Sequence, residues 1–356
     1  MMKMPKHGTA WLALCMLYAA PPAVAETFKF TIISPAPPSV TPTTATKEYF
    51  VPEINRRLAA SGADLKIEWN EAYGPNLAKF SEILENVEEG IAHFGVLLRN
   101  FEESKLPLEQ YPSMVPFGII DPYAMQKVDA RVRARVPQMN EMFLKFNQIM
   151  IASASSPPPH IFTRFEVRSV DDLKGRKIGS SGAMGHVLRG TGAVMVTAAM
   201  SSSYSDIKNK VYEGYTMGET QAFPYRTFEV AQHLTRVYFG VTNVPSLVVN
   251  KKTWDAMPAA LRTTITEVAA RWGDEYLKMD SARTSEFTEK MVAQGLKVSE
   301  MPTAERQRWA RMMPNIAKEW ATTMDKEGLP GTAILTAYMD EVRASGQPVV
   351  RDWDKE

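Results

Sequence analysis

The residues best suited to bind a ligand are a run of small side chains where a predicted strand meets a predicted helix. Residues 177–192 read KIGSSGAMGHVLRGTG. The small residues of this run are Gly179, Ser180, Ser181 and Gly182. Bare backbone can present N–H groups, the two hydroxyls add donors, and a helix starting at Ala183 would add partial positive charge. The alternative is that the segment is only a tight turn.

Further candidates for ligand binding stand at the ends of predicted strands or can line a pocket. They are Tyr73, Arg99, Phe117, His160, Thr220, Gln221, Phe223 and Pro37, the last in the loop after the first predicted strand. Arg99 follows the apolar run AHFGVLL, and ligands of α/β proteins bind where strands end. Tyr73 could stack on a ring. Arg99 could equally be a surface residue, and the aromatic residues could equally belong to the core.

The sequence lacks the compact signatures of catalysis. It has no G-x-S-x-G, H-E-x-x-H, Walker or C-x-x-C motif. The histidines after residue 25 are too far apart for a local metal motif: His93, His160, His186 and His233. We therefore expect no catalytic residue, no metal and no cofactor, although an enzyme with a dispersed site would leave no local trace.

The first 25 residues have the pattern of a secretory signal peptide. Two lysines precede a short apolar run, and residues 23–25 read AVA, an A-x-A cleavage pattern. The only cysteine, Cys15, lies in this segment, so the mature chain would have neither a disulfide nor a thiolate. We expect cleavage near Ala25 and a soluble protein exported to the periplasm.

Length and charge narrow the class of protein further. The 356 residues, of which 45% are hydrophobic, are enough for one large domain or two ordinary ones. Lys and Arg total 41 against 40 for Asp and Glu, which gives a net charge of +1. Because nucleic-acid-binding proteins carry a basic field, we expect no nucleic-acid partner.

Strand and helix patterns alternate along the chain and predict two α/β lobes. The predicted strands cover 28–34, 65–69, 91–98, 148–154, 176–178, 193–196, 215–217, 239–241 and 246–250. The predicted helices between them cover 44–60, 76–89, 183–189 and 205–213. Two crossings between the lobes, near residues 152–158 and 242–246, indicate a hinge.

The last third of the chain is predicted to be helical. Apolar residues recur at Leu261, Ile265, Val268, Trp272 and Tyr276, one face of a helix over about 258–290. About 30 helical residues span roughly 45 Å, enough to cross both lobes. The predicted division is a signal peptide (1–25), lobe I with the spanning helix (26–152 and about 244–290), lobe II (153–243 and about 291–345) and a tail (346–356).

Four segments resemble blocks of the substrate-binding proteins of TRAP (tripartite ATP-independent periplasmic) transporters, of the dicarboxylate-binding-protein type. They are YPSMVPFGI at 111–119, VRSVDDLKGRKIGSSG at 167–182, YSDIKNKVYEGYTMGETQAFP at 204–224 and FGVTNVPSLVVNKKTWDAMP at 239–258. Their order and spacing match the family over nearly the whole mature chain. The resemblance implies a two-lobed, type II-like periplasmic-binding-protein fold that closes on a small organic solute, most often a carboxylate, without covalent chemistry.

The sequence departs from this family at the residues that usually hold a carboxylate. Gly179 stands at the arginine of the family's KIR segment, Pro159 at a second arginine, and Gln221 at the asparagine of GQENP. A charged hydrogen bond is worth about 1.5–3 kcal/mol, so the missing arginines would weaken carboxylate binding. Backbone at 179–182 could bind the ligand instead, the pocket could be enlarged for a bulkier or more neutral ligand, or the segment could be only a turn.

The resemblance therefore predicts a TRAP solute receptor, not an enzyme. It would bind an organic acid, with aromatic and alicyclic acids among the candidates, and deliver it to the small and large membrane subunits. We expect a monomer. The alternatives are a binding protein for another transporter or a sensor, and a periplasmic enzyme with a dispersed site.

Overall fold

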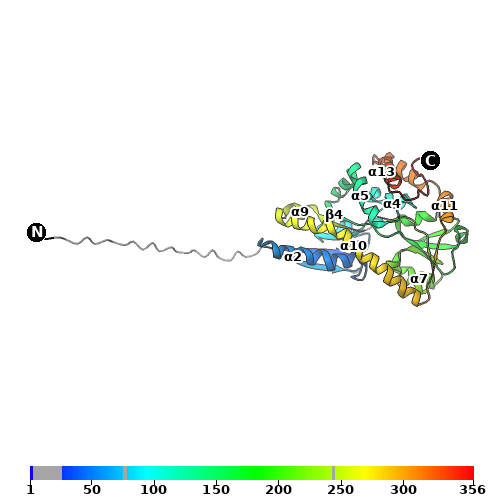
Figure 1. The fold of residues 1–356 in the computed structure, drawn as a ribbon, viewed down its shortest axis with the longest axis horizontal. Helices are drawn as coiled ribbons and strands as arrows, with labels where there is room; N and C mark the ends of the chain where they lie inside the picture. Colours follow the sequence, from blue (N-terminus) through cyan, green and yellow to red (C-terminus); the bar gives the residue numbers. More distant parts are fainter. Residues whose placement is uncertain (3–25, 75–77, 243–244) are drawn as a thin grey trace.

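Two β-sheets with helices packed around them build the two lobes of the molecule (Figure 1). The computed structural model describes residues 1–2, 26–74, 78–242 and 245–356. The predicted signal peptide and its cleavage site near Ala25 lie outside the described residues. The two sheets and a 35-residue helix confirm the predicted α/β, two-lobed fold with a long helix.

The first sheet has five strands in the order β2-β1-β3-β10-β4. They are β1 (Glu26–Ser34), β2 (Leu65–Tyr73), β3 (Phe94–Leu98), β4 (Gln148–Ser153) and β10 (Pro245–Asn250). Strand β1 is parallel to β2 and β3, whereas β10 is antiparallel to β3 and β4. Strands β3 and β10 are buried along their whole length, which is why they read as apolar runs in the sequence.

The second sheet has six strands in the order β11-β9-β5-β8-β6-β7. They are β5 (His160–Thr163), β6 (Lys177–Ser180), β7 (Val194–Thr197), β8 (Gly214–Met217), β9 (His233–Arg236) and β11 (Lys297–Glu300). The chain enters this sheet between β4 and β5 and leaves it between β9 and β10. The sequence pattern did not predict β5, β9 or β11.

Several helices differ from the predicted ranges. The range 44–60 is α1 (Thr41–Ala45), a π-helical turn η1 (Thr46–Phe50) and α2 (Val51–Ser61). Among the described residues of 76–89, helix α3 covers only Ile83–Glu88. The range 205–213 is α7 (Ser203–Lys208), and 183–189 is not an α-helix but a 3-10 helix, η5 (Gly182–Leu188).

The predicted strand over 239–241 is irregular backbone. It bonds to the irregular segment 117–119: Phe117 N–H donates to Phe239 O at 2.6 Å, and Val241 N–H donates to Ile119 O at 2.7 Å. The apolar residues predicted a strand because Phe239 and Val241 are buried, but Gly240 has a φ of +110° and the partners at 117–119 belong to neither sheet.

Helix α10 (Ala259–Ala293) runs from one lobe to the other (Figure 1). It packs on β4, α1 and α2 of the first lobe and on α8 (Glu219–Ala222) of the second. Its buried side includes the predicted stripe of Leu261, Ile265, Val268, Trp272 and Tyr276. The helix therefore touches both walls of the space between the lobes.

The remaining helices surround the sheets. The α-helices are α4 (Tyr111–Met114), α5 (Pro122–Arg135), α6 (Gln138–Leu144), α9 (Lys251–Ala256), α11 (Thr303–Met312), α12 (Ile316–Lys326) and α13 (Gly331–Ala344). Short 3-10 turns are η2 (Arg99–Phe101), η3 (Pro107–Gln110), η4 (Val170–Leu173), η6 (Met200–Ser202) and η7 (Thr227–Glu229).

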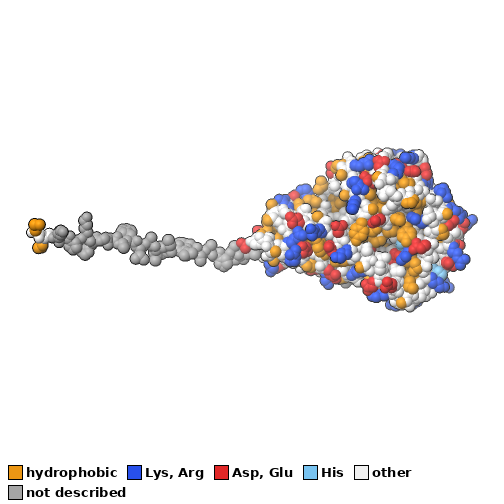
Figure 2. Space-filling view, in the orientation of Figure 1, with side chains coloured by type: hydrophobic (Ala, Val, Ile, Leu, Met, Phe, Trp, Pro, Cys, Tyr) orange, Lys and Arg blue, Asp and Glu red, His pale blue; other side chains and the backbone are white. Residues whose placement is uncertain are grey.

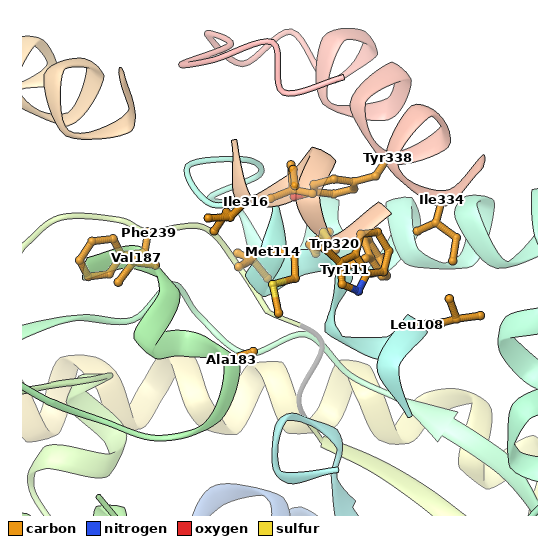
Figure 3. Close-up of a cluster of buried hydrophobic side chains, with 14 of the residues drawn as sticks. Leu108, Tyr111, Met114, Ala183, Val187, Phe239, Ile316, Trp320, Ile334 and Tyr338 are labelled. Carbon is orange, nitrogen blue, oxygen red and sulfur yellow. The ribbon is translucent and has the colours of Figure 1, made fainter. Parts of the chain in front are cut away.

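The C-terminal helices α12 and α13 pack on helices of the middle part of the chain and complete a hydrophobic core with them. Helix α12 packs on α4, and α13 packs on α5. Figure 3 shows Tyr111 and Met114 of α4 beside Trp320 and Ile316 of α12. Ala183 of η5 belongs to the same cluster, so this 3-10 turn is held against a core that three distant parts of the chain build.

The surface carries charges of both signs. Figure 2 shows Lys and Arg interspersed with Asp and Glu over the visible face. Among the helices of the described residues, none combines the length and apolar composition needed to cross a membrane.

Candidate ligand-binding site

A cavity lies between the two lobes, and we call it the interlobe cavity. Its volume is about 110 Å³. The segments that follow β1, β3, β6, β7 and β8 all contribute to its wall. A single water needs only about 10–15 Å³ by this measure, so the interlobe cavity has room for a small organic molecule.

Both lobes, the chain crossings and the long helix line this cavity. Asn100 and Phe101 face it from the first lobe, and Ser181 and Met200 from the second. The crossings contribute Ser156, Pro157, Pro159, Thr242 and Pro245, and α10 contributes Tyr276 and Thr284. A molecule in this cavity would therefore contact every part that has to move if the lobes open or close.

The lining is largely apolar with neutral polar groups between. Val40, Leu98, Phe80, Met184 and Met217 supply apolar surface. Serine, threonine, asparagine, glutamine and tyrosine side chains supply hydroxyl and amide groups. Among the described residues that line the cavity there is no lysine, arginine or histidine, and the one carboxylate is Glu219. The wall therefore offers an anion no full positive charge.

Glu219 is held by partners behind the wall. Its Oε1 accepts a hydrogen bond from Arg236 Nε at 3.0 Å, and His160 Nε2 lies 3.7 Å from its Oε2. His160 Nδ1 in turn accepts from the Tyr238 backbone N–H at 3.2 Å. Burial lowers the pKa of His160, which keeps the ring neutral at neutral pH. His160 thus supports the wall and does not line it.

A second carboxylate, Asp280, lies on α10 one turn from each lining residue of that helix. It follows Tyr276 by four residues and precedes Thr284 by four, so all three share one face. Its side chain is only 1% exposed, and within the described residues neither carboxylate oxygen has a well-formed hydrogen bond, although the Thr41 and Thr220 hydroxyls lie close enough to act on it. Burial raises its pKa to about 6, against the lowering effect of Thr41, Thr220 and Arg283 nearby.

Three of the predicted binding residues line the interlobe cavity: Ser181, Thr220 and Gln221. Gln221 Oε1 accepts the Gly218 backbone N–H at 3.1 Å, which turns its donating Nε2 group to other partners. Ser180 points elsewhere, because its hydroxyl pairs with Thr216 Oγ1 at 2.5 Å. Gly182, with a φ of +53°, packs against the Asn100 carbonyl of the opposite lobe.

Gly179 lies beneath two tyrosines and not at the cavity. A Cβ at this position would be 2.6 Å from Tyr215 Cδ2 and 2.8 Å from Tyr212 Cε2. Tyr215 is itself fixed, since its hydroxyl donates to Ala198 O at 2.7 Å. The space that a side chain at 179 would need is therefore filled by protein and does not widen the cavity.

Replacing Gly179 with alanine is expected to lower the free energy of unfolding by about 1–2 kcal/mol, because the methyl group overpacks this site. Urea unfolding of the purified protein measures the change. Lys177→Ala, an exposed position on the same strand, is the control and should change little. Unchanged stability of the Gly179→Ala protein would show that the tyrosines move aside freely.

The other predicted binding residues do not line the cavity. Arg99 is fully buried and is held by Glu109 at 2.6 Å and Ser153 at 2.8 Å. Phe117 packs on Phe239 and Trp309, and Phe223 stacks on Phe287 with ring centroids 4.6 Å apart. Tyr73 packs against the core of the first lobe, and the carbonyl of half-buried Pro37 accepts the Val40 N–H.

Sequence reasoning missed Glu219 and Asp280. Glu219 directly precedes the predicted binding residues Thr220 and Gln221, and this position could have identified it as a lining residue. Asp280 continues the apolar stripe of Trp272 and Tyr276 at the next four-residue step. A carboxylate on the buried face of a helix is a signal of function, because burying an unpaired charge is costly.

Comparison with known proteins finds similarity to extracellular solute-binding proteins. The family model of bacterial extracellular solute-binding proteins, family 7, matches residues 48–323. The C4-dicarboxylate-binding periplasmic protein DctP of Rhodobacter capsulatus is 24% identical over 299 residues, which cover 74% of this chain and 87% of that protein.

Solved structures share the fold. A Bordetella pertussis extracytoplasmic solute receptor binding pyroglutamic acid has a TM-score of 0.74 and 18% identity, covering 87% of this chain and 99% of its own. A TRAP solute-binding protein from Rhodoferax ferrireducens T118, in complex with copurified benzoate, has a TM-score of 0.77 and 14% identity, covering 89% and 98%.

Proposed function

The chain belongs to the bacterial extracellular solute-binding proteins of family 7, and we propose that it captures one small organic solute in the interlobe cavity. The family consists of periplasmic solute receptors that work with membrane permease subunits, and not of enzymes. The proposed role is therefore reversible binding and delivery to a TRAP-type permease, with the ligand returned unchanged.

The observation that carries this proposal is the composition of the cavity wall. Side chains from both lobes, both chain crossings and α10 meet around one cavity. A ligand there binds the closed arrangement better than an open one, because opening separates the walls. By linkage, the ligand favours closure by the ratio of those two affinities. The permease can then recognise the closed form.

The size and lining support a compact solute with an apolar body. The related receptors named above bind pyroglutamic acid and benzoate, both small cyclic acids. Phe80, Phe101 and the methionines of this cavity can pack on a ring of that size. We assign Ser181, Thr220 and Gln221 to the ligand's polar groups, since they line the cavity and offer neutral donors.

The finer points of the proposal concern processing and assembly. We propose that the precursor is cleaved near Ala25 and that the mature protein acts as a monomer with the small and large membrane subunits. Size-exclusion chromatography with light scattering on the mature protein tests the second point, and mass spectrometry of the periplasmic protein tests the first.

A thermal-shift and small-angle scattering experiment tests the proposed function. Refolded, ligand-free protein is mixed with a bacterial metabolite extract, and the expected result is a higher Tm with a smaller radius of gyration. At about a hundred times Kd a ligand adds about 2.7 kcal/mol of stability. A Met200→Trp protein, with the cavity filled, should lose the response, whereas Gln232→Ala, at an exposed position, should keep it.

Chemical conversion of a captured compound, or a response unchanged by Met200→Trp, would contradict the proposal. The first result would point to an enzyme with a dispersed site. The second would place binding outside the interlobe cavity.

A further inference from the structure

The charge of the cavity wall limits what can bind there. Among the described lining residues Glu219 is the one acidic residue and none is a lysine, arginine or histidine, and Arg236 pairs with Glu219 from behind the wall at 3.0 Å. Asp280 adds a buried carboxylate next to Thr220, Tyr276 and Thr284. A simple anion in this cavity would meet negative charge and no facing cation, which is unfavourable where water is excluded.

Asp280 has acceptor capacity that the described protein does not use. Neither oxygen has a well-formed hydrogen bond among the described residues, and the Thr41 and Thr220 hydroxyls nearby can fill only part of a carboxylate's acceptor capacity. The charged and titratable groups near it are Glu219 of α8 and Arg283 and Tyr276 of its own helix. Arg283 donates to the Ser39 backbone carbonyl at 2.9 Å and so does not pair with Asp280.

We propose, on the basis of the proposed function, that the ligand brings its own donor, an ammonium group, which binds at the Asp280 end of the cavity. The ligand class is then an amino-bearing organic acid, whose positive charge offsets Asp280. Its carboxylate meets the neutral donors Ser181, Gln221 and Tyr225 at the second lobe. Such a compound is zwitterionic, so it enters without adding net charge to the wall.

The alternative ligand is a simple carboxylate that shares a proton with Asp280. The pH dependence of the binding affinity distinguishes these two ligand classes. An ammonium group favours ionised Asp280, so its affinity rises between pH 5 and pH 7.5. A simple carboxylate needs protonated Asp280, so its affinity falls over the same range. Burial raises the pKa of Asp280 to about 6, which places the transition inside this window.

The decisive experiment uses ring compounds of one size and the captured metabolite itself. Compounds taken from a bacterial metabolite extract by ligand-free protein are identified by mass spectrometry. Calorimetry then compares the affinities for cyclohexanecarboxylate, pipecolate and piperidine at pH 5 and pH 7.5. We expect a captured compound with an amino group, and pipecolate to bind at least tenfold more tightly than cyclohexanecarboxylate at pH 7.5.

Variants of α10 show whether Asp280 is responsible. Asp280→Asn should lower pipecolate affinity at least tenfold and abolish its rise with pH, whereas Glu286→Gln, an exposed carboxylate on the same helix, should change neither. Capture of compounds that lack an amino group, or equal pipecolate affinity in the Asp280→Asn protein, would overturn this inference and leave the receptor function intact. Capture of nothing by folded protein would contradict the receptor function itself.

Discussion

Replacing Glu109 with glutamine is expected to lower the free energy of unfolding by about 3–5 kcal/mol, because it removes the shared counter-charge of two buried guanidinium groups. Glu109 Oε2 accepts from Arg99 Nη1 at 2.6 Å, and Oε1 accepts from Arg133 Nη1 at 2.8 Å. Arg99 and Glu109 are fully buried, and Arg133 is nearly so. Glutamine keeps the shape but leaves one of these arginines without a charge partner.

Asp129 completes the buried network and gives it a pH dependence. It accepts from Arg133 Nε at 2.9 Å and from the Tyr111 hydroxyl at 2.9 Å. Burial raises the pKa of Asp129, but Arg133 and Arg99 outweigh burial, so the pKa ends below its usual value. A carboxyl with a lowered folded-state pKa stabilises the protein at neutral pH and loses that stabilisation as the pH falls below about 4.

Urea unfolding at pH 7 measures the effect of Glu109→Gln. The control is Glu166→Gln, which removes a carboxylate from an exposed pair with Arg168 and should change stability little. Equal stabilities of the Glu109→Gln protein and the unmodified protein would mean that the two arginines find other compensation. The ligand-free form should be used for all three proteins, so that binding does not mask the difference.

The second large effect is a gain of stability in the ligand-free Asp280→Asn protein at neutral pH. The pKa of Asp280 is about 6 in the folded state and about 3.9 in an unfolded chain. The folded state therefore binds the proton more tightly, and stability falls as the pH rises from about 4 to about 6. A difference of about two pKa units corresponds to roughly 2–3 kcal/mol at pH 7 and above.

Asparagine has no charge to desolvate, so the expected gain is about 2–3 kcal/mol at pH 7.5 and close to zero at pH 4. Thermal unfolding of ligand-free protein at both pH values measures it, with Glu286→Gln as the control on the same helix. A gain that is equal at pH 4 and pH 7.5 would show that the charge is not its cause. Together with the expected loss of binding, this result would identify a residue that destabilises the empty receptor and serves the ligand.

The parts of the fold that sequence predicts are those with a local signal. Strands β3 and β10 are buried along their whole length, so apolar residues dominate both. The long helix α10 shows a stripe with a period of three to four residues. Both signals come from residues that are neighbours along the chain.

The missed elements depend on distant partners. Strands β5, β9 and β11 have four residues each, and the pairing of β9 with β5 and β11 joins residues 64 to 74 positions apart, as in Phe162 with Leu234. The run after Ser180 has helix-forming residues but folds as a 3-10 turn, with Ala183 and Val187 packed into a core that includes the C-terminal helices. Tertiary contacts decide these segments, and no local pattern records them.

The same distinction holds for the candidate site. Ser181, Thr220 and Gln221 follow strand ends, a position that sequence can identify. The surroundings of Gly179 could not be predicted, because Tyr212 and Tyr215, which fill them, lie more than 30 residues further along the chain. Asp280 left a trace in the sequence, a charged residue in an apolar stripe, but its closeness to Thr220 exists only in the folded lobes.

Strand β10 has a consequence for the order in which the protein can be built. It fills the gap between β3 and β4, yet the whole of β5 to β9 is synthesised before it. A nascent chain that has not reached Pro245 carries β3 and β4 with unpaired apolar edges, which invite association with other chains. The first lobe is thus the earliest to leave the ribosome. Its sheet cannot be completed until most of the second lobe has been synthesised. A chaperone that holds the growing chain would therefore protect the first strands of this lobe above all.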